Sequence, residues 1–387
     1  MIRVGLVFEH DRQWMGGVNY YRNLLAAIAA LPDRQIEPVI ILGLKEDAEN
    51  IPDLPIGEIV YSQLAVRKSP SWLVRKFLLK ILSRDILLER LLKRHRVDVL
   101  SHSGCLGKRS AIPSISWVSD LQHRRMPQFF RRRERLLRDH TIGSWCRNCS
   151  AIILSSHDAR QDMQELYPDC KARLEVLQFV SQVASAEADA ASGKERPASD
   201  VHGKYFLVAN QFWVHKNHRV VIDALALLKS AGRDVAVIAT GNTHDYRQPG
   251  FYSELLAYAQ HRGVTDNFSV PGMVPAPVLA RLMRGAVAVI NPSEFEGWNT
   301  AVEEAKSLGK AIILSDIPVH REQSPAYARY FKPHDAEALA EAMWEAWAEY
   351  DVASDTASRQ AAQRVFLQRQ LAFGRRYQEI VLGALHQ

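Results

Sequence analysis

The chain of 387 residues has little of what marks secreted, membrane-spanning or disordered proteins. Its four cysteines are too few for a disulfide scaffold, so we expect reduced structural thiols in a cytoplasmic protein. The first residues lack the basic start and long apolar stretch of a signal peptide, and no run of about 18 apolar residues predicts a spanning helix. A chain with 47% apolar and 24% charged residues is typical of a globular protein, at this length of one or two domains.

Metal ligands at the usual spacing are also scarce. Cys146 and Cys149 form one C-x-x-C pair, but neither a second pair nor a suitably spaced histidine accompanies them. A structural zinc ion takes about four protein ligands. We therefore expect no zinc site, and since no Asp-x-Asp follows a strand we expect no other metal.

The positive charge is concentrated in one part of the chain. Residues 51–150 hold 20 Lys and Arg against 8 Asp and Glu, whereas residues 201–387 hold 19 of each. Nucleic acid, an anionic membrane surface and an acidic substrate are the candidate partners for such an excess. Nothing resembles a helix-turn-helix or a stacking-aromatic RNA module, so we expect no nucleic acid.

Short apolar runs alternate with helical patterns along the chain. This rhythm predicts parallel strands covered by helices on both faces. The expected strands lie at residues 4–8, 38–44, 97–100, 114–118, 151–154, 205–209, 234–240, 267–270, 286–290 and 311–315.

The rhythm breaks in a small, polar, aperiodic stretch that predicts a linker at 184–203. The linker separates two Rossmann-like domains of an α/β protein, at 1–183 and 204–365, whose sheets are expected to face a central cleft. A C-terminal helix at 366–387 is expected to pack back on the first domain. Ligands of such sheets bind beyond the carboxyl ends of the strands.

The most informative loop follows the strand at 286–290 and leads into a helix. It offers a carboxylate at Glu296, a glycine at Gly297 that permits close backbone approach, and a second carboxylate at Glu304 inside the helix. The amides of Asn299 and Thr300 at the helix start suit a phosphate. Carboxylates accept hydrogen bonds from sugar hydroxyls.

The Glu-x7-Glu spacing of Glu296 and Glu304 resembles the motif of retaining GT-B glycosyltransferases of family 4, known as glycosyl transferases group 1. The resemblance implies that Glu296 contacts the donor sugar and Glu304 the ribose of a nucleotide. Trp298, Asn299 and Thr300 replace the family's Phe-Gly-Leu in the loop that lines the sugar pocket.

Further segments fit the same resemblance. Lys216 is placed to neutralise a diphosphate, while Gln211 stands where the family usually has arginine. Asn217 is expected to cap the following helix, and His215 and His218 to lie at the surface or in the cap. The glycine pair ending at Gly17 resembles the family's N-terminal loop at the donor phosphate.

Other candidates follow further strands. Ser119 stands where many family members have histidine, so Asp120 or His123 is expected to take that place at the donor sugar, and His123 alone could equally be structural. The strand-end pairs Gly241–Asn242 and Gly272–Met273 resemble loops that approach the sugar phosphate and the base. His320 follows another strand end without an assigned role.

A strongly apolar helical pattern at 69–96 carries basic residues, among them Arg75, Lys76 and Lys80. It predicts either a patch for an anionic membrane or anionic acceptor, or a core helix with a solvated basic face. In the first case the protein would work at the inner face of the membrane.

The resemblance implies metal-independent, retaining transfer of a hexose or deoxyhexose from a nucleotide-diphosphate sugar to a glycan or lipid-linked acceptor, in bacterial surface polysaccharide synthesis. No cofactor is expected. A sugar-nucleotide epimerase of the same fold and a non-catalytic sugar-binding protein are the alternatives.

Overall fold

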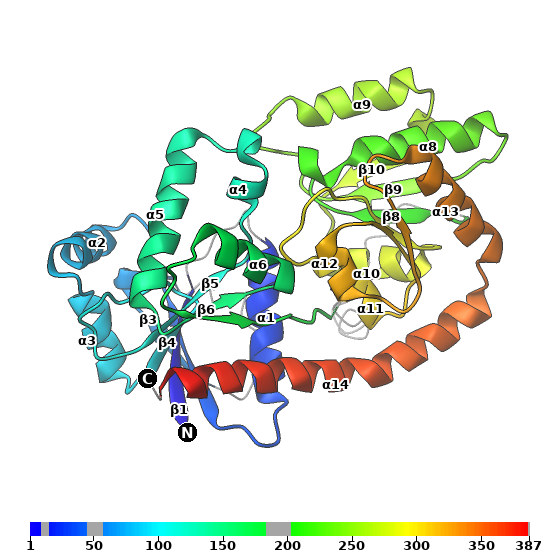
Figure 1. Cartoon of the computed structure of the whole chain (residues 1–387). Coiled ribbons are helices and arrows are strands. Elements are labelled where there is room, and N and C mark those ends of the chain that lie inside the picture. The colour runs from blue at the N-terminus through cyan, green and yellow to red at the C-terminus, as the bar shows by residue number, and fades with distance from the viewer. Residues whose placement is uncertain (9–14, 45–56, 183–202, 386–387) are drawn as a thin grey trace. The chain divides into compact units, whose positions relative to one another are not determined.

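The computed structural model describes residues 1–8, 15–44, 57–182 and 203–385 (Figure 1). The chain forms two compact units, the first made of residues 1–180 with 368–387 and the second of residues 181–367. Most of the predicted linker, residues 184–202, lies outside the described residues.

The first unit is built on a parallel sheet. Its strands are β1 Ile2–Phe8, β2 Ile36–Leu42, β3 Glu58–Tyr61, β4 Val99–Ser101, β5 Ser114–Val118, β6 Ala151–Leu154 and β7 Arg173–Val176. In the described residues they take the order β3-β2-β1-β4-β5-β6-β7, with every pairing parallel. Its helices are α1 Met15–Ala29, α2 Pro70–Leu82, α3 Ile86–Arg94, α4 Gln122–Arg125, α5 Arg132–Asn148 and α6 His157–Leu166.

Helices bury both faces of this sheet. Leu6 and Phe8 of β1 pack against α1, whereas Val7 between them packs with α3 on the opposite face. Successive side chains of a strand point to opposite faces, which is why a fully apolar strand suits a sheet covered on both sides.

All four cysteines lie in one apolar cluster of the first unit, between α5, α6 and the strands β5 and β6. Cys146 and Cys149 are buried in it, Cys105 and Cys170 pack against it, and all four thiols are free.

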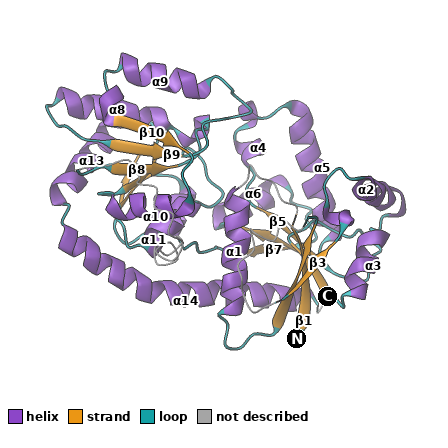
Figure 2. Cartoon of the chain, turned by 180° about the vertical axis from the view of Figure 1, so that it is seen from behind, coloured by secondary structure: helices purple, strands orange, loops and turns teal. Residues whose placement is uncertain are grey.

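The second unit repeats the plan. Its strands are β8 Phe206–Ala209, β9 Val237–Thr240, β10 Phe268–Gly272, β11 Val289–Asn291, β12 Ile312–Ser315 and β13 Ala328–Phe331, which form a parallel sheet in the order β10-β9-β8-β11-β12-β13 over the described residues. Its helices are α8 His218–Ser230, α9 Phe251–His261, α10 Ala276–Gly285, α11 Thr300–Ser307, α12 Pro318–Gln323 and α13 Ala336–Glu349. Figure 2 shows the strands of each unit between helices.

The core of the second unit again lies on both faces of the sheet. Phe206 and Val208 of β8 pack with α8, α9 and α13, while Leu207 packs with α10 and α11 on the other face. This alternation fixes which loops leave the carboxyl edge of the sheet and therefore positions the site.

The last helix, α14 Val352–Ala384, contributes to both units. Its end belongs to the first unit, where the Arg376 guanidinium lies 2.6 Å from the Glu175 carboxylate and the Gln378 side chain accepts a hydrogen bond from the Gln35 amide at 2.7 Å. Gly374 allows α14 to approach α1, because a Cβ there would lie 2.6 Å from the Ala27 carbonyl oxygen.

Among the helices in the described part of the chain, none has the length and apolar character needed to cross a membrane.

Candidate functional site

The candidate site lies where the strand order of the second sheet reverses. β8 is flanked by β9 on one side and by β11 on the other, so the loops after β8 and β11 turn to opposite faces of the sheet. Ligands of doubly wound sheets bind in the crevice that such a reversal opens. The loops after β8, β9, β11 and β12 carry most of the candidates predicted for the second domain.

Lys216 and Glu296 meet across this reversal. Lys216 ends a 3-10 turn, Val214–Lys216, after β8, and Glu296 lies in the loop after β11. The Lys216 Nζ lies 2.6 Å from the Glu296 Oε1, and the two side chains are 13% and 8% exposed. A lysine and a carboxylate that the sequence separates by a whole βαβαβ stretch thus form one ion pair at the edge of the sheet.

Asn299 fixes the carboxylate of Glu296. Its side-chain amide donates a hydrogen bond to the Glu296 Oε1 at 2.7 Å. The same side chain caps α11, because its Oδ1 accepts a hydrogen bond from the Val302 amide at 3.1 Å. Thr300 begins the helix, as predicted, and Gly297 and Trp298 complete the loop.

Glu304 lies in the second turn of α11 and is buried. The Ser181 hydroxyl donates a hydrogen bond to its Oε1 at 3.3 Å. Burial raises the pKa of the Glu304 carboxyl to about 7, since a charged carboxylate is disfavoured away from water. The helix therefore holds a carboxyl group near its ionisation point at neutral pH.

The neighbouring Glu303 has a structural role. Its carboxylate lies 3.0 Å from the Lys306 ammonium and accepts a hydrogen bond from the Gln323 amide at 3.0 Å. The same Gln323 amide donates to the Asn299 carbonyl at 2.9 Å, so α12 supports the start of α11.

Gly241 and Asn242 follow β9, and Met273 follows β10. A Cβ on Gly241 would lie 2.1 Å from the Asn210 carbonyl oxygen, so this position requires glycine. The Gly241 amide donates to the Gly272 carbonyl at 3.0 Å, which joins the two strand ends, and the Met273 side chain is largely exposed.

The histidines of this unit are placed differently from the prediction. His215 and His218 are buried rather than at the surface, and burial lowers the pKa of His218 to about 3. The His218 ring stacks on Phe212 with ring centroids 4.4 Å apart. The imidazole rings of His215 and His218 are therefore buried on either side of Lys216 in the sequence.

Asn217 also departs from its predicted role as a side-chain cap. It precedes α8 in a left-handed conformation, with a φ of 55°. Its side-chain amide makes no capping bond and donates instead to the carbonyls of Pro292 and Pro333. It thereby ties the loop after β8 to the loops after β11 and β13.

His320 is a member of the site to which the sequence assigned no role. It follows β12 in α12, its ring is buried, and its Nδ1 lies 2.8 Å from the Ser315 carbonyl oxygen. Burial lowers the pKa of the His320 imidazole. The negative charge of Glu296 acts in the opposite direction, so Glu296 lies near enough to His320 to interact with it electrostatically. The signal that could have found it is its position just past a strand end.

The candidates of the first unit lie at the ends of their own strands. Gly17 is buried in the first turn of α1, after β1. Asp120 follows β5 and accepts a hydrogen bond from the Gln122 amide at 3.0 Å. The buried His123 ring lies 3.0 Å from the Asp139 carboxylate of α5, which is the contact of a structural histidine. Burial lowers its pKa.

Arg75 does not lie on the outer face of α2, contrary to the prediction. It is buried and lies 2.9 Å from the Asp85 carboxylate, which is equally buried. Of the three predicted surface cations, Lys76 and Lys80 are exposed.

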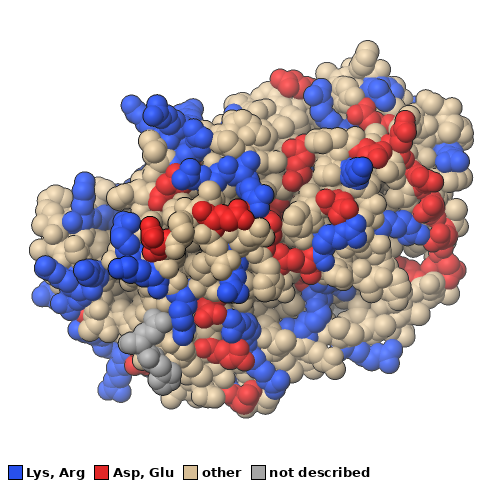
Figure 3. Space-filling model, viewed as in Figure 1, with Lys and Arg blue, Asp and Glu red and all other residues tan. Residues whose placement is uncertain are grey.

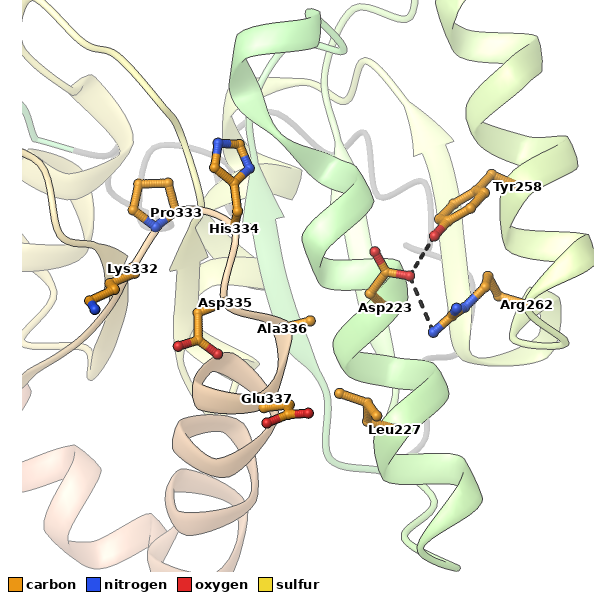
Figure 4. A pocket seen from close by; sticks show the side chains of 10 residues that line it. All are labelled: Asp223, Leu227, Tyr258, Arg262, Lys332, Pro333, His334, Asp335, Ala336 and Glu337. Carbon is orange, nitrogen blue, oxygen red and sulfur yellow. Dashed lines mark hydrogen bonds and ion pairs between the residues drawn. The ribbon is translucent and has the colours of Figure 1, made fainter.

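A surface pocket also lies in the second unit, between α8, α9 and the start of α13 (Figure 4). Asp223 points from α8 toward α9, where its carboxylate contacts the Tyr258 hydroxyl at 2.6 Å and the Arg262 guanidinium at 3.3 Å. None of the predicted donor-site residues lines this pocket.

In the described residues, no group of three or more His, Cys, Asp or Glu is arranged to hold a metal ion.

Residues 192–363 match the family model described as Glycosyl transferases group 1, a stretch that covers most of the second unit. No curated protein sequence matches the chain.

Solved structures of glycosyltransferases share the fold over nearly the whole length of both chains. A glycosyltransferase from Rickettsia africae is 16% identical with a TM-score of 0.66, covering 99% of this chain and 98% of its own. HepE from Anabaena, in complex with UDP and glucose, is 17% identical with a TM-score of 0.64 and coverages of 98% and 99%. The lipopolysaccharide outer core galactosyltransferase WaaB is 14% identical with a TM-score of 0.60 and coverages of 98% and 99%. The fold is GT-B, as predicted.

Proposed function

We propose that the chain is a retaining, metal-independent glycosyltransferase that moves a hexose or deoxyhexose from a nucleotide-diphosphate sugar to a glycan or lipid-linked acceptor. The observation that carries the proposal is the constellation of Lys216, Glu296, Asn299 and Glu304 at the strand-order reversal. A group 1 domain spans these residues, and HepE, which shares the fold, binds UDP and glucose.

Each residue has a role that its chemistry supports. Lys216 is a point charge that can neutralise the leaving diphosphate, together with the positive end of the α11 helix dipole. Glu296, oriented by Asn299, accepts hydrogen bonds from the hydroxyls of the donor sugar. Glu304, one turn deeper, accepts them from the ribose.

The pairing of Lys216 with Glu296 sets the electrostatics before the donor binds. Each charge neutralises the other in a largely buried position, where an isolated charge would be costly. An incoming diphosphate replaces Glu296 as the partner of the ammonium, and the sugar hydroxyls replace Lys216 as partners of the carboxylate. The two groups are therefore already placed for the phosphate and the sugar of one ligand.

In the transfer itself, the bond between the anomeric carbon and the diphosphate oxygen breaks, and the nucleoside diphosphate leaves. The acceptor hydroxyl forms the new bond at the same face of the sugar and gives its proton to the leaving phosphate. Lys216 stabilises the charge that develops on that phosphate, where a fixed cation is most effective. This front-face course rests on the resemblance to the retaining family.

The test is turnover with a panel of UDP-, GDP- and dTDP-sugars, with and without a membrane extract as acceptor. A transferase releases nucleoside diphosphate in an acceptor-dependent way, and NMR of the product gives the anomeric configuration. An epimerase would convert the nucleotide sugar without acceptor, and a binding protein would bind it without turnover. Either result would overturn the proposal.

The proposal also covers the acceptor and the biosynthetic process in which the reaction takes place. WaaB acts on the lipopolysaccharide outer core, and it shares the fold with this chain. We place the reaction in bacterial surface polysaccharide synthesis, on the cytoplasmic side of the membrane that carries a lipid-linked acceptor. Product formation on lipid extracts, separated by solvent partition, tests this placement.

A further inference from the structure

Helix α2 presents its apolar side chains to water. Leu73, Val74, Phe77 and Ile81 are each more than half exposed. They lie at the spacing that places residues on one side of a helix. We call this set the α2 stripe. An ordinary surface helix turns such residues toward the core, so the stripe is a feature that needs an explanation.

One charged side chain of the same helix, Arg75, is turned inward. The Arg75 guanidinium lies 2.9 Å from the Asp85 carboxylate at the start of α3, and its Nη1 donates to the Leu64 carbonyl at 2.7 Å. A buried ion pair with a further hydrogen bond fixes the rotation of a helix, because any other rotation would strand a charge. The exposure of the α2 stripe is thus built in by Arg75.

Cations flank the α2 stripe. Lys76 and Lys80 are exposed on α2, a helix with no acidic residue. Lys108 and Arg109 are exposed in the loop after β4, which contacts the end of α2 where the Arg109 amide donates to the Ser83 carbonyl at 3.3 Å. Figure 3 shows blue Lys and Arg side chains gathered on the side where Figure 1 draws α2 and α3.

We propose that the α2 stripe docks on an anionic membrane surface, with its apolar side chains in the boundary between headgroups and acyl chains and its flanking cations on the lipid phosphates. A helix of 13 residues with an apolar face and a basic rim is suited to lie in that boundary. Neighbouring Lys and Arg add attraction to anionic lipids.

Charge favours this occupant over a second copy of the chain. A two-fold contact through the α2 stripe would bring Lys76 and Lys80 of both copies together, with no acid on either helix to offset them. An anionic lipid surface supplies the opposite charge. The inference deepens the proposed function by placing a lipid-linked acceptor beside the enzyme, and its test needs no glycosyl transfer.

The experiment is flotation of the full chain with phosphatidylcholine vesicles, with and without phosphatidylglycerol, at low and high salt. The parent protein floats with the anionic vesicles at low salt and less at high salt. F77S/I81S removes half of the α2 stripe and weakens binding roughly tenfold or more. K76S/K80S weakens binding to anionic vesicles by a similar factor and reduces the salt dependence.

A matched control removes exposed apolar side chains elsewhere. V365S/L367S changes two exposed residues of α14 in the second unit and leaves flotation unchanged. Unfolding midpoints and nucleotide binding of all variants show that the fold and the donor site are intact. These readouts separate a failure of the membrane proposal from a failure of the proposed function.

Three results would overturn the inference. The parent protein would fail to float with anionic vesicles, or F77S/I81S would float like the parent. In the third, sedimentation would show a dimer of the parent chain that F77S/I81S dissolves, which would make the α2 stripe an interface between two copies.

Discussion

The Lys216 ammonium lies 2.6 Å from the Glu296 carboxylate, and the pair joins the loops after β8 and β11 at the point where the strand order reverses. A phosphate binds to a cation, and sugar hydroxyls donate to a hydrogen-bond acceptor. The ion pair holds the cation, Lys216, and the acceptor, Glu296, next to each other without a ligand.

Replacing Lys216 with alanine removes the cation that faces the leaving diphosphate. We expect kcat/KM to fall by about 100-fold or more, in the range seen for the loss of one fixed group that stabilises transition-state charge. Steady-state release of nucleoside diphosphate measures it. Lys229→Ala, at the end of α8, is the matched control and keeps parental turnover, because its ammonium donates to the Gly263 carbonyl and not to a residue of the candidate site. Parental turnover in Lys216→Ala would refute the role.

Glu296→Gln separates the two halves of the donor. The neutral side chain no longer competes with phosphate for Lys216, so we expect the nucleoside diphosphate to bind as tightly as before or more tightly. Turnover falls by about 100-fold because the sugar loses its charged hydrogen-bond acceptor. Calorimetry and kinetics on the same preparation give both numbers. A parallel loss of nucleotide affinity and turnover would contradict the assignment of Glu296 to the sugar.

Glu304 makes stability depend on pH. Its pKa is raised in the folded chain to about 7 from an ordinary 4.5, so the stability it supports is full below 4.5 and is lost as the pH rises through 7. The loss is at most about 3 kcal/mol. Glu304→Gln removes this dependence. Urea unfolding at about pH 5 and about pH 7.5 gives the unfolding free energy at each pH. If this free energy changes equally between the two pH values in parent and variant, Glu304 does not titrate in this window.

Nucleotide binding should release a proton from Glu304. Ribose hydroxyls that donate to the carboxylate favour its charged form and lower its pKa, so near pH 7 about half a proton leaves. Calorimetry in buffers of different ionisation enthalpy measures the release. The Glu304→Gln variant corrects for protons from the phosphate itself. If the parent and the variant release the same number of protons, the ribose does not contact Glu304.

Gly241→Ala tests the backbone at the end of β9. The new Cβ would lie 2.1 Å from the Asn210 carbonyl oxygen, and that contact is with backbone, so the strand ends must shift. We expect a loss of about 2–4 kcal/mol in unfolding free energy. Gly232→Ser is a milder comparison, because no atom lies near a Cβ at that position, although its φ of 72° still favours glycine. Equal stability of the parent and Gly241→Ala would contradict the close approach.

The sequence pattern predicts the central strands and the loop that carries Glu296. β1, β2, β5, β6 and β8 are buried on both faces and therefore read as short apolar runs. β3, β7 and β13 do not show as apolar runs, because they lie at the edges of their sheets, where partly exposed residues such as those of Arg173–Val176 interrupt the apolar pattern.

The contacts of the site were less predictable. The spacing of Glu296 and Glu304 indicated carboxylates on one helix start, but no local pattern shows that Lys216 reaches Glu296 or that Glu304 is buried. The type and position of Asn217 predict a helix cap, yet its amide donates to two distant carbonyls. The pattern of α2 predicts a surface cation at Arg75, because its partner Asp85 lies at the start of the following helix and is not visible in that pattern. Such pairings depend on tertiary packing.

The measurement that tests the central claim most directly is hydrogen–deuterium exchange of the full chain with and without a nucleoside diphosphate. We expect protection of peptides covering residues 210–218 and 291–305, with the effect lost in the Lys216→Ala variant. Protection confined to the peptides lining the pocket of Figure 4, around residues 258–262 and 332–337, would contradict the claim that the strand-order reversal of the second unit binds the donor.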